Sequence, residues 1–213
     1  MEDSGWKASQ ILRLLKRNNL RPESIVEIGC GAGEILNQLY MEMPAETNFA
    51  GYEVSPDAYR LCLQRKKERL DFFHENLLVK DVRYDLLLMM DVFEHVDDYI
   101  GFIKTSSGKA TYKIYHIPLD ISVSSVLRNV LTRVRNEVGH LHYFTKDTAI
   151  ATIEYTGQQI IDHFYTAGAI ELNNRSHTWK TRMLNLPRKL LFKLSPDMAV
   201  KLFGGYSLLV LAK

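Results

Sequence analysis

Cysteine is scarce in this sequence, and its scarcity excludes two classes of small protein. Cys30 and Cys62 are the only cysteines among 213 residues, so neither a disulfide framework nor a metal site built from several thiolates is available. The acidic start of the chain, Met1 to Gly5, has no apolar core, and we expect no secretory signal peptide. Apolar runs long enough for a membrane-spanning helix are also lacking. We therefore expect a cytoplasmic protein with reduced thiols.

The sequence also lacks a large excess of charge of one sign, because the formal net charge at pH 7 is only +2. The charged residues are, however, unevenly distributed along the chain. Residues 173–213 contain eight Lys and Arg and one acid, Asp197, so they carry +7 and leave −5 for the rest. The basic residues of this region are mixed with an apolar set from Met183 to Leu194. Such a segment suits peripheral contact with an anionic membrane or a cap over an apolar pocket. We favour the cap, because helical apolar stripes more often pack on a core. The sequence has no RNA-binding motif, so a nucleic-acid partner is not expected.

Predicted strands and helices alternate along the chain, which indicates βαβ units. We therefore expect a doubly wound α/β fold with a mainly parallel sheet and helices on both faces. One domain should span residues 1–213, with residues 120–139 and 174–205 as insertions that form a helical lid or substrate cap. The apolar spacing from Val123 to Val134 predicts a helix in the first insertion. The predicted strands are 24–29, 48–54, 71–73, 84–90, 111–117, 159–165 and 206–212, and two of the predicted helices are 99–104 and 146–155.

A glycine-rich loop follows the first predicted strand, in the sequence Glu27-Ile-Gly-Cys-Gly-Ala-Gly-Glu34. In open α/β sheets, the turn from a strand into a helix is where ligands bind. Glycine lets the backbone turn tightly and approach a ligand where a Cβ atom would collide. We therefore expect Gly29, Cys30, Gly31 and Gly33 to line a cofactor.

The spacing within this loop excludes two common nucleotide-binding motifs. A dinucleotide fingerprint requires G-x-G-x-x-G, and the third position here is Glu34. No Gly-Lys-Ser/Thr follows, which excludes a Walker loop. The Glu34 carboxylate would also repel a pyrophosphate at the start of the helix. An acidic loop suits a cofactor that lacks phosphate and has a positive centre, and S-adenosylmethionine has both properties.

Acidic residues beside the loop suit the same cofactor. Glu27 precedes the loop and can accept a hydrogen bond from the cofactor's ammonium group. Glu53 ends the second predicted strand, 20 residues beyond Gly33, and its two oxygens can accept hydrogen bonds from both ribose hydroxyls. Val54 follows Glu53 and is expected to contact the cofactor as well.

Three segments together resemble the class I S-adenosylmethionine-dependent methyltransferases. These segments are Val26-Glu-Ile-Gly-Cys-Gly-Ala-Gly-Glu, Gly51-Tyr-Glu-Val-Ser and Tyr84-Asp-Leu-Leu-Leu-Met-Met-Asp-Val-Phe-Glu-His-Val. They look closest to the branch that contains small-molecule methyltransferases of quinone biosynthesis. The resemblance implies a seven-stranded Rossmann-like sheet whose last strand pair includes an antiparallel member. It also implies S-adenosylmethionine as cofactor, with S-adenosylhomocysteine (SAH) as its product.

The resemblance further assigns two cofactor contacts. In the family, an acid after the third strand usually accepts a hydrogen bond from the adenine amino group. Asn76 occupies that place here, and its side-chain oxygen can still accept; the neighbouring Glu75 is the alternative. Asp91, directly after the fourth strand, matches a position that meets the methionine part of the cofactor or the substrate.

Histidines near the predicted site admit three interpretations. His95 can be structural, or His95, His140 or His142 can act as a general base, because imidazole titrates near neutral pH. In the third interpretation, Asp91, Glu94, His95 and a later histidine hold a divalent metal ion. We expect no metal, because Glu94 and His95 are adjacent and their side chains would diverge by about 100° on a helix.

The sequence thus predicts a methyltransferase that uses S-adenosylmethionine to methylate O, N or C of a small molecule. Both an apolar and a polar acceptor stay open. Two alternatives stay open. One is an RNA methyltransferase that uses the basic C-terminal region, and the other is a non-catalytic regulatory subunit that binds S-adenosylmethionine. The methyl acceptor and the oligomeric state are not readable from the sequence.

Overall fold

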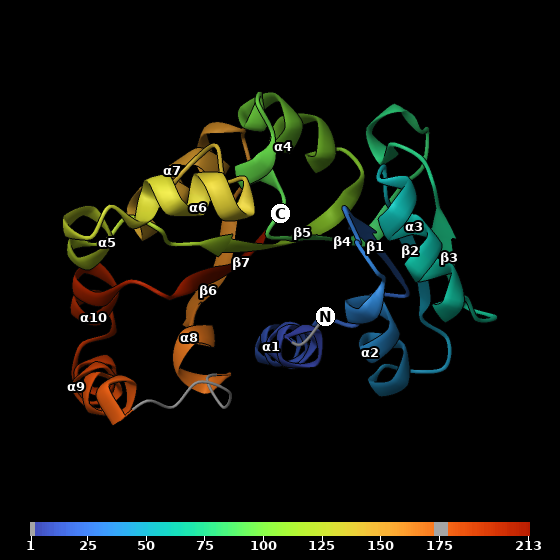
Figure 1. The fold of residues 1–213 in the computed structure, drawn as a ribbon. Coiled ribbons are helices and arrows are strands. Elements are labelled where there is room, and N and C mark those ends of the chain that lie inside the picture. The colour runs from blue at the N-terminus through green and yellow to red at the C-terminus, as the bar shows by residue number, and fades with distance from the viewer. Residues whose placement is uncertain (1–2, 173–178) are drawn as a thin grey trace.

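The computed structural model describes residues 3–172 and 179–213, which form one seven-stranded sheet with helices on both faces (Figure 1). The strand order is β3-β2-β1-β4-β5-β7-β6. Neighbours from β3 to β5 run parallel, whereas β7 is antiparallel to both β5 and β6. The predicted fold class, including its antiparallel member, is therefore confirmed. The strands are β1 (Ser24–Ile28), β2 (Asn48–Tyr52), β3 (Leu70–Phe73), β4 (Tyr84–Met90), β5 (Ala110–Pro118), β6 (Ile160–Thr166) and β7 (Ser207–Ala212).

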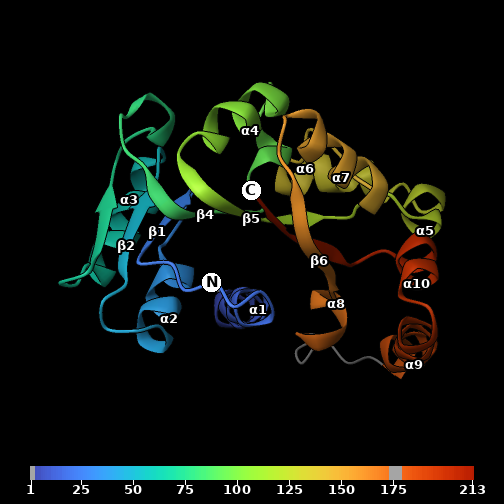
Figure 2. The ribbon, with the colours of Figure 1, turned by 180° about the vertical axis from the view of Figure 1, so that it is seen from behind.

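The helices form two layers, one on each face of the sheet (Figures 1 and 2). Residues of α1, α2 and α3 pack on one face, and residues of α4, α7 and α10 pack on the other. The α-helices are α1 (Ser4–Arg17), α2 (Glu34–Glu42), α3 (Pro56–Cys62), α4 (Tyr99–Ser107), α5 (Val123–Leu127), α6 (Val130–Val138), α7 (Lys146–Tyr155), α8 (Gly168–Glu171), α9 (Trp179–Leu194) and α10 (Pro196–Phe203). Short 3₁₀ turns are η1 (Leu63–Arg65), η2 (Leu77–Val79) and η3 (Phe93–His95).

Strand β4 is buried on both faces, as its unbroken apolar run predicts. Leu86, Leu88 and Met90 face the α1–α2 layer, and Leu87 and Met89 face the α4–α7 layer.

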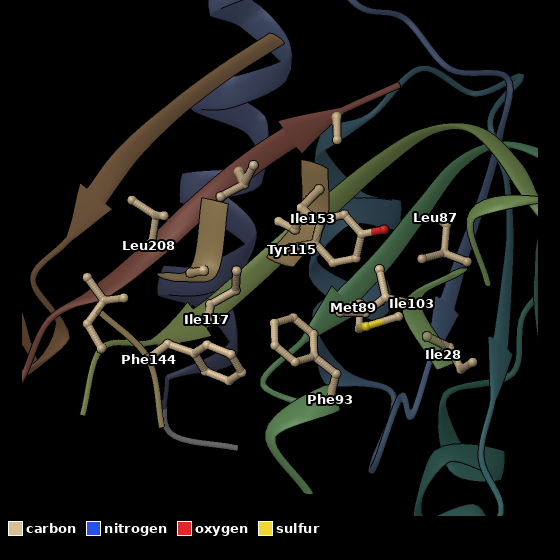
Figure 3. Close-up of a cluster of buried hydrophobic side chains, with 14 of the residues drawn as sticks. Ile28, Leu87, Met89, Phe93, Ile103, Tyr115, Ile117, Phe144, Ile153 and Leu208 are labelled. Carbon is tan, nitrogen blue, oxygen red and sulfur yellow. The ribbon is translucent and has the colours of Figure 1, made fainter. Parts of the chain in front are cut away.

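The hydrophobic core between the sheet and the α4–α7 layer surrounds Tyr115, which is fully buried among Phe93, Ile103 and Ile153 (Figure 3). Its hydroxyl donates a 2.8 Å hydrogen bond to Gln158 Oε1, so the one polar atom of this side chain is satisfied. A packed core directly behind β4 and β5 fixes the ends of these strands, where the site lies.

The predicted helix from Val123 to Val134 differs from the structure. Two helices, α5 and α6, replace it, because Asn129 adopts a left-handed backbone with φ of 52°. Val123, Val126 and Leu127 are exposed, so these side chains make no apolar contact that would stabilise α5 and α6 as one continuous helix.

Both predicted cap segments are helical where the structure describes them. Helices α5 and α6 fall in the first, and α9 and α10 in the second; residues 174–178 of the second lie outside the described residues. Helices α5, α9 and α10 gather at one end of the sheet (Figure 1). A capping function for these segments stays a prediction. Among the described residues, no helix has the length and hydropathy needed to cross a membrane.

Candidate functional site

The predicted cofactor residues converge at the carboxyl edge of the parallel strands. The glycine loop follows β1, Glu53 follows β2, and Asp91 follows β4, which lies on the other side of β1. The loop is joined to β2 by hydrogen bonds from the N–H groups of Gly29 and Cys30 to the carbonyl oxygen of Tyr52. Parallel strands bring these separate segments to one edge, which is where open α/β sheets bind their ligands.

Glycine is required at position 33 for two reasons. Its φ is +73°, in the left-handed region, and a Cβ atom built there would lie 2.5 Å from the ring of Phe72. Phe72 lies on β3 and is buried, so the ring cannot move aside cheaply. The close approach lets α2 begin directly over the sheet, with the loop curved around the strand ends.

Glu53 holds the glycine loop in shape. Its Oε2 accepts a hydrogen bond from the N–H of Gly31, and its Oε1 accepts from the N–H of Ser55, both at 2.8 Å. The residue is 8% exposed. The carboxylate is thus fixed where β2 ends, with one oxygen on the loop and one on the start of α3.

Glu27 is a buried carboxyl without a complete set of partners. It lies on β1 and is 2% exposed, and its Oε2 has no hydrogen-bond partner among the described residues. Burial raises its pKa to about 8; Lys7 opposes this rise and Glu53 adds to it. Because an unpaired buried polar group is costly, a positive ligand group at this position would stabilise the ionised form.

Asp91 is the most tightly held of the predicted residues. Its Oδ2 pairs with Lys7 Nζ at 2.7 Å, and its Oδ1 lies 2.6 Å from His116 Nδ1. Burial alone would raise the pKa of Asp91, but the charges and hydrogen bonds of His116 and Lys7 outweigh burial and lower it. Its φ of 57° is uncommon for a residue other than glycine, and such conformations cluster at functional sites.

Lys7 and His116 are site residues that the sequence analysis missed. His116 interrupts the apolar run of β5, and its Nε2 lies 2.9 Å from Thr166 Oγ1; a polar residue near the end of a buried strand was a readable signal. Lys7 carried no such signal. It lies on α1, ahead of the glycine loop in sequence, and it also pairs with Asp3 at 2.7 Å.

The remaining predicted cofactor residues have these positions. Cys30 is buried, and burial raises the pKa of its thiol. Val54 is exposed, and its carbonyl oxygen lies 3.1 Å from His74 Nε2. Asn76 is exposed at the start of η2, where its side-chain oxygen accepts from the N–H of Leu78 at 2.9 Å. Glu75, the alternative to Asn76, pairs with Lys80.

A cavity of about 320 Å³ lies beside Asp91. It opens between α1, the ends of β4 and β5, and the segments around β7, and its lining includes Trp6, Lys7, His116, Asp120 and Tyr206. A larger hollow of about 410 Å³ lies near Pro22 and Asp85, at the opposite edge of the sheet. We place the site at the smaller cavity, because that cavity lies where the strands end.

The three predicted catalytic histidines separate into a pair and a single residue. His95 and His140 meet edge to face, with ring centroids 4.9 Å apart. His142 Nε2 instead lies 3.0 Å from the carbonyl oxygen of Val96, and its ring packs on Tyr99.

Glu94 joins the histidine pair, which corrects a geometric expectation. One ligand atom each from Glu94, His95 and His140 lie within 4.8 Å of one another. The expectation that Glu94 and His95 point too far apart to share an ion is contradicted by this proximity, which the two side chains reach from consecutive positions of the short turn η3. Burial and the charge of Asp91 raise the pKa of Glu94 to about 9.

Solved structures with the same fold are methyltransferases. Magnesium protoporphyrin IX methyltransferase from Synechocystis PCC 6803, with bound SAH, is 13% identical over 98% of this chain and 82% of its own, with a TM-score of 0.65. The mycolic acid cyclopropane synthase CmaA1, complexed with SAH and CTAB, is 12% identical over 89% and 76%, with a TM-score of 0.60. The plantazolicin methyltransferase BpumL, in complex with SAH, is 16% identical over 90% and 76%, with a TM-score of 0.55.

The fold and the glycine loop at its carboxyl edge define the class of this protein as a class I S-adenosylmethionine-dependent methyltransferase. The family model described as "Methyltransferase domain" matches residues 6–160, and the chain belongs to that family. No curated protein matches the sequence. The predicted enzyme class and the predicted cofactor are confirmed.

We predict that Glu53→Ala weakens binding of SAH about 10- to 100-fold. The substitution would remove two charge-assisted hydrogen bonds from the ribose hydroxyls, and competition with water limits their net contribution to several kcal/mol. Isothermal titration calorimetry with SAH measures the change. Asp57→Ala is the matched control, since it removes a carboxylate whose side chain is 89% exposed on the neighbouring helix α3. An unchanged dissociation constant in folded Glu53→Ala would exclude Glu53 from the cofactor site.

Proposed function

We propose that this protein binds S-adenosylmethionine across the carboxyl edge of β1, β2 and β4 and methylates a small molecule held in the cavity beside Asp91. The observation that carries the proposal is the buried carboxyl of Glu27 on β1, whose Oε2 has no hydrogen-bond partner within residues 3–172 and 179–213. The cofactor's ammonium group supplies the positive charge that this carboxyl lacks. Its sulfonium adds a second positive centre to an edge where several carboxylates meet.

Each remaining cofactor residue takes a role that its position supports. Glu53 accepts from the ribose hydroxyls, with Val54 beside it, and the loop residues 29–33 approach the cofactor through their backbone. Asn76 contacts adenine, for which its side-chain oxygen must leave the N–H of Leu78 or its amide group must act instead. Asp91, which is held by Lys7 and His116 and lines the cavity, meets the methionine part of the cofactor or the substrate.

The acceptor is proposed to be small and partly apolar. The cavity of about 320 Å³ has Trp6 and Tyr206 in its lining together with the charged residues Lys7 and Asp120. Transfer from a sulfonium needs mainly alignment and exclusion of water. The named substrates of two similar structures, magnesium protoporphyrin IX and a mycolic acid, support an acceptor with a large apolar part.

Among the predicted catalytic histidines, His140 has the strongest connection with the acceptor. Its Nδ1 lies 2.7 Å from Asp120 Oδ2, and Asp120 lines the cavity. His95 contacts His140 and so belongs to the same group. His142 is held by backbone carbonyl oxygens of the Val96–Asp97 segment, which supports a structural role for it.

We expect methyl transfer from radiolabelled S-adenosylmethionine to small apolar molecules that carry a hydroxyl or amine, and none to RNA. The reasons are the cavity of about 320 Å³, which has charged groups beside an aromatic lining, and the lack of an RNA-binding motif in the sequence. Extraction of the labelled product into organic solvent measures the transfer. Label recovered in RNA at low salt would favour the RNA alternative, and SAH binding without transfer to any class of acceptor would favour a regulatory subunit.

We also propose that helix α9 makes peripheral contact with an anionic membrane. Leu186, Leu190 and Leu194 recur every four residues and are 71%, 59% and 74% exposed. The exposed Lys189 and Lys193 lie along the same face. Apolar side chains flanked by lysines fit a surface that is both apolar and negatively charged.

We expect the protein to co-sediment with vesicles that contain phosphatidylserine and not with vesicles of phosphatidylcholine alone. Replacing Leu186, Leu190 and Leu194 together by Ser should weaken this binding at least about 10-fold, because the apolar contact is lost. Val79→Ser is the control, since Val79 is 78% exposed on η2, away from α9. Equal binding to both vesicle types, or full binding of the triple variant, would contradict the proposal.

A further inference from the structure

Glu94, His95 and His140 form a group that cofactor binding does not explain. They come from two segments 45 residues apart, the η3 turn after β4 and the loop after α6, yet their ligand atoms lie within 4.8 Å of one another. The loop is fastened to the turn by its backbone, because the N–H groups of Leu141 and His142 donate to the carbonyl oxygen of Glu94 at 2.8 and 3.2 Å. The fold therefore holds this group together independently of the three side chains.

Both imidazoles are oriented through the same nitrogen. His95 Nδ1 lies 3.1 Å from the carbonyl oxygen of Gly139, and His140 Nδ1 lies 2.7 Å from Asp120 Oδ2. A carbonyl oxygen and a carboxylate can only accept, so Nδ1 of each ring carries the hydrogen and the lone pair is on Nε2. This pairing of a histidine with an outer acceptor is typical of histidines that bind metal ions.

The carboxyl of Glu94 has no partner in the protein. The residue is 0% exposed, and both of its oxygens lack a hydrogen bond among the described residues. Neither His95 nor His140 donates a hydrogen bond to it. Buried polar groups nearly always have a hydrogen-bond or ionic partner. We therefore expect this carboxyl to bind a group that the protein chain does not provide.

We propose that Glu94, His95 and His140 bind one divalent transition-metal ion. Two imidazole nitrogens and one carboxylate oxygen suit Zn²⁺, Co²⁺ or Fe²⁺, whereas Mg²⁺ prefers a shell of oxygens. Three protein ligands leave at least one position open. Asp91 is outside the site, because its two oxygens contact Lys7 and His116.

The open coordination position of the metal ion can bind the methyl acceptor. This role in the reaction rests on the proposed function, whereas the metal site itself does not. Asp120 orients His140 and also lines the acceptor cavity, so the site adjoins the place proposed for the methyl acceptor. A divalent cation lowers the pKa of a hydroxyl that contacts it. The site therefore favours an acceptor whose hydroxyl is the methylated group.

The test is a titration of tag-free protein with CoCl₂ and ZnCl₂, followed by visible absorption for Co²⁺ and by calorimetry for Zn²⁺. We expect one ion per chain and no comparable heat with MgCl₂. Glu94→Gln and His140→Ala should each weaken Zn²⁺ binding at least about 100-fold, since loss of an outer partner alone costs about 10- to 100-fold. Asp120→Asn should weaken Zn²⁺ binding by about 10- to 100-fold, because Asp120 is the outer partner of His140. A merely structural role for Asp120 would not produce this loss.

His142→Ala is the matched control, because His142 lies in the same loop but outside the group, and its Zn²⁺ affinity should stay within about threefold of the unsubstituted protein. Circular dichroism and SAH binding check that each variant is folded, and they report on the cofactor site independently of the metal. Absence of stoichiometric Co²⁺ and Zn²⁺ binding would overturn the proposal. Binding that persists in both Glu94→Gln and His140→Ala, as for an ion held by Cys30 or Cys62, would overturn it too.

Discussion

Burial of carboxyl groups at one edge of the sheet is the constraint on which the rest of this site depends. Glu27, Glu53, Asp91 and Glu94 all lie just before or after the ends of neighbouring parallel strands. Taking a carboxylate out of water is costly unless another group pairs with it. The four residues meet this cost in two different ways, because the protein supplies partners for Glu53 and Asp91, whereas the described residues leave Glu27 and Glu94 without a full set.

Asp91 and Glu53 are satisfied by the protein itself. Asp91 has Lys7 and His116, and Glu53 has two backbone N–H groups. The contacts of Asp91 with Lys7 and His116, and of Glu53 with Gly31, join segments that are far apart in the sequence, so they fasten α1, β5 and the glycine loop to the strand ends. The contact of Glu53 with Ser55 is local. The unusual backbone of Asp91, with φ of 57°, is held by the same contacts.

Glu27 and Glu94 are satisfied incompletely or not at all, and both have a pKa that burial raises well above the usual range. Each therefore fits a positively charged ligand. For Glu27 the cofactor's ammonium group has the matching charge, and for Glu94 a metal ion has it.

Local sequence signals predicted much of this fold. Strand β4 and helix α7 have the bounds that were expected, because an unbroken apolar run defines the first and the capping box of Thr145 and Thr148 defines the start of the second. The position of Glu27, Glu53 and Asp91 at one edge of the sheet was also predictable, because each lies in or directly after a buried strand.

Contacts between distant segments were not predictable in the same way. Lys7 reaches Asp91 across 84 residues, and no local pattern on α1 indicates that contact. His140 meets Glu94 only because the loop after α6 returns to η3. The short 3₁₀ turn η3 also places Glu94 and His95, where the sequence pattern favoured a regular helix. The residues proposed for the cofactor were therefore accessible from local sequence signals, whereas contacts such as those of Lys7 and His140 were not.

Glu27 is proposed to pair with the positive charge of the cofactor, and the protons released on binding measure this pairing. With a pKa of about 8, Glu27 is mostly protonated at pH 7 before the cofactor binds. Pairing with an ammonium group lowers the pKa of a carboxyl, so binding should expel close to one proton per cofactor. Calorimetric titration with S-adenosylmethionine, in two buffers that differ in ionisation enthalpy, measures this release. We expect a larger proton release from the unsubstituted protein than from Glu27→Gln, and equal release from the two proteins would exclude Glu27 as the partner of the ammonium group.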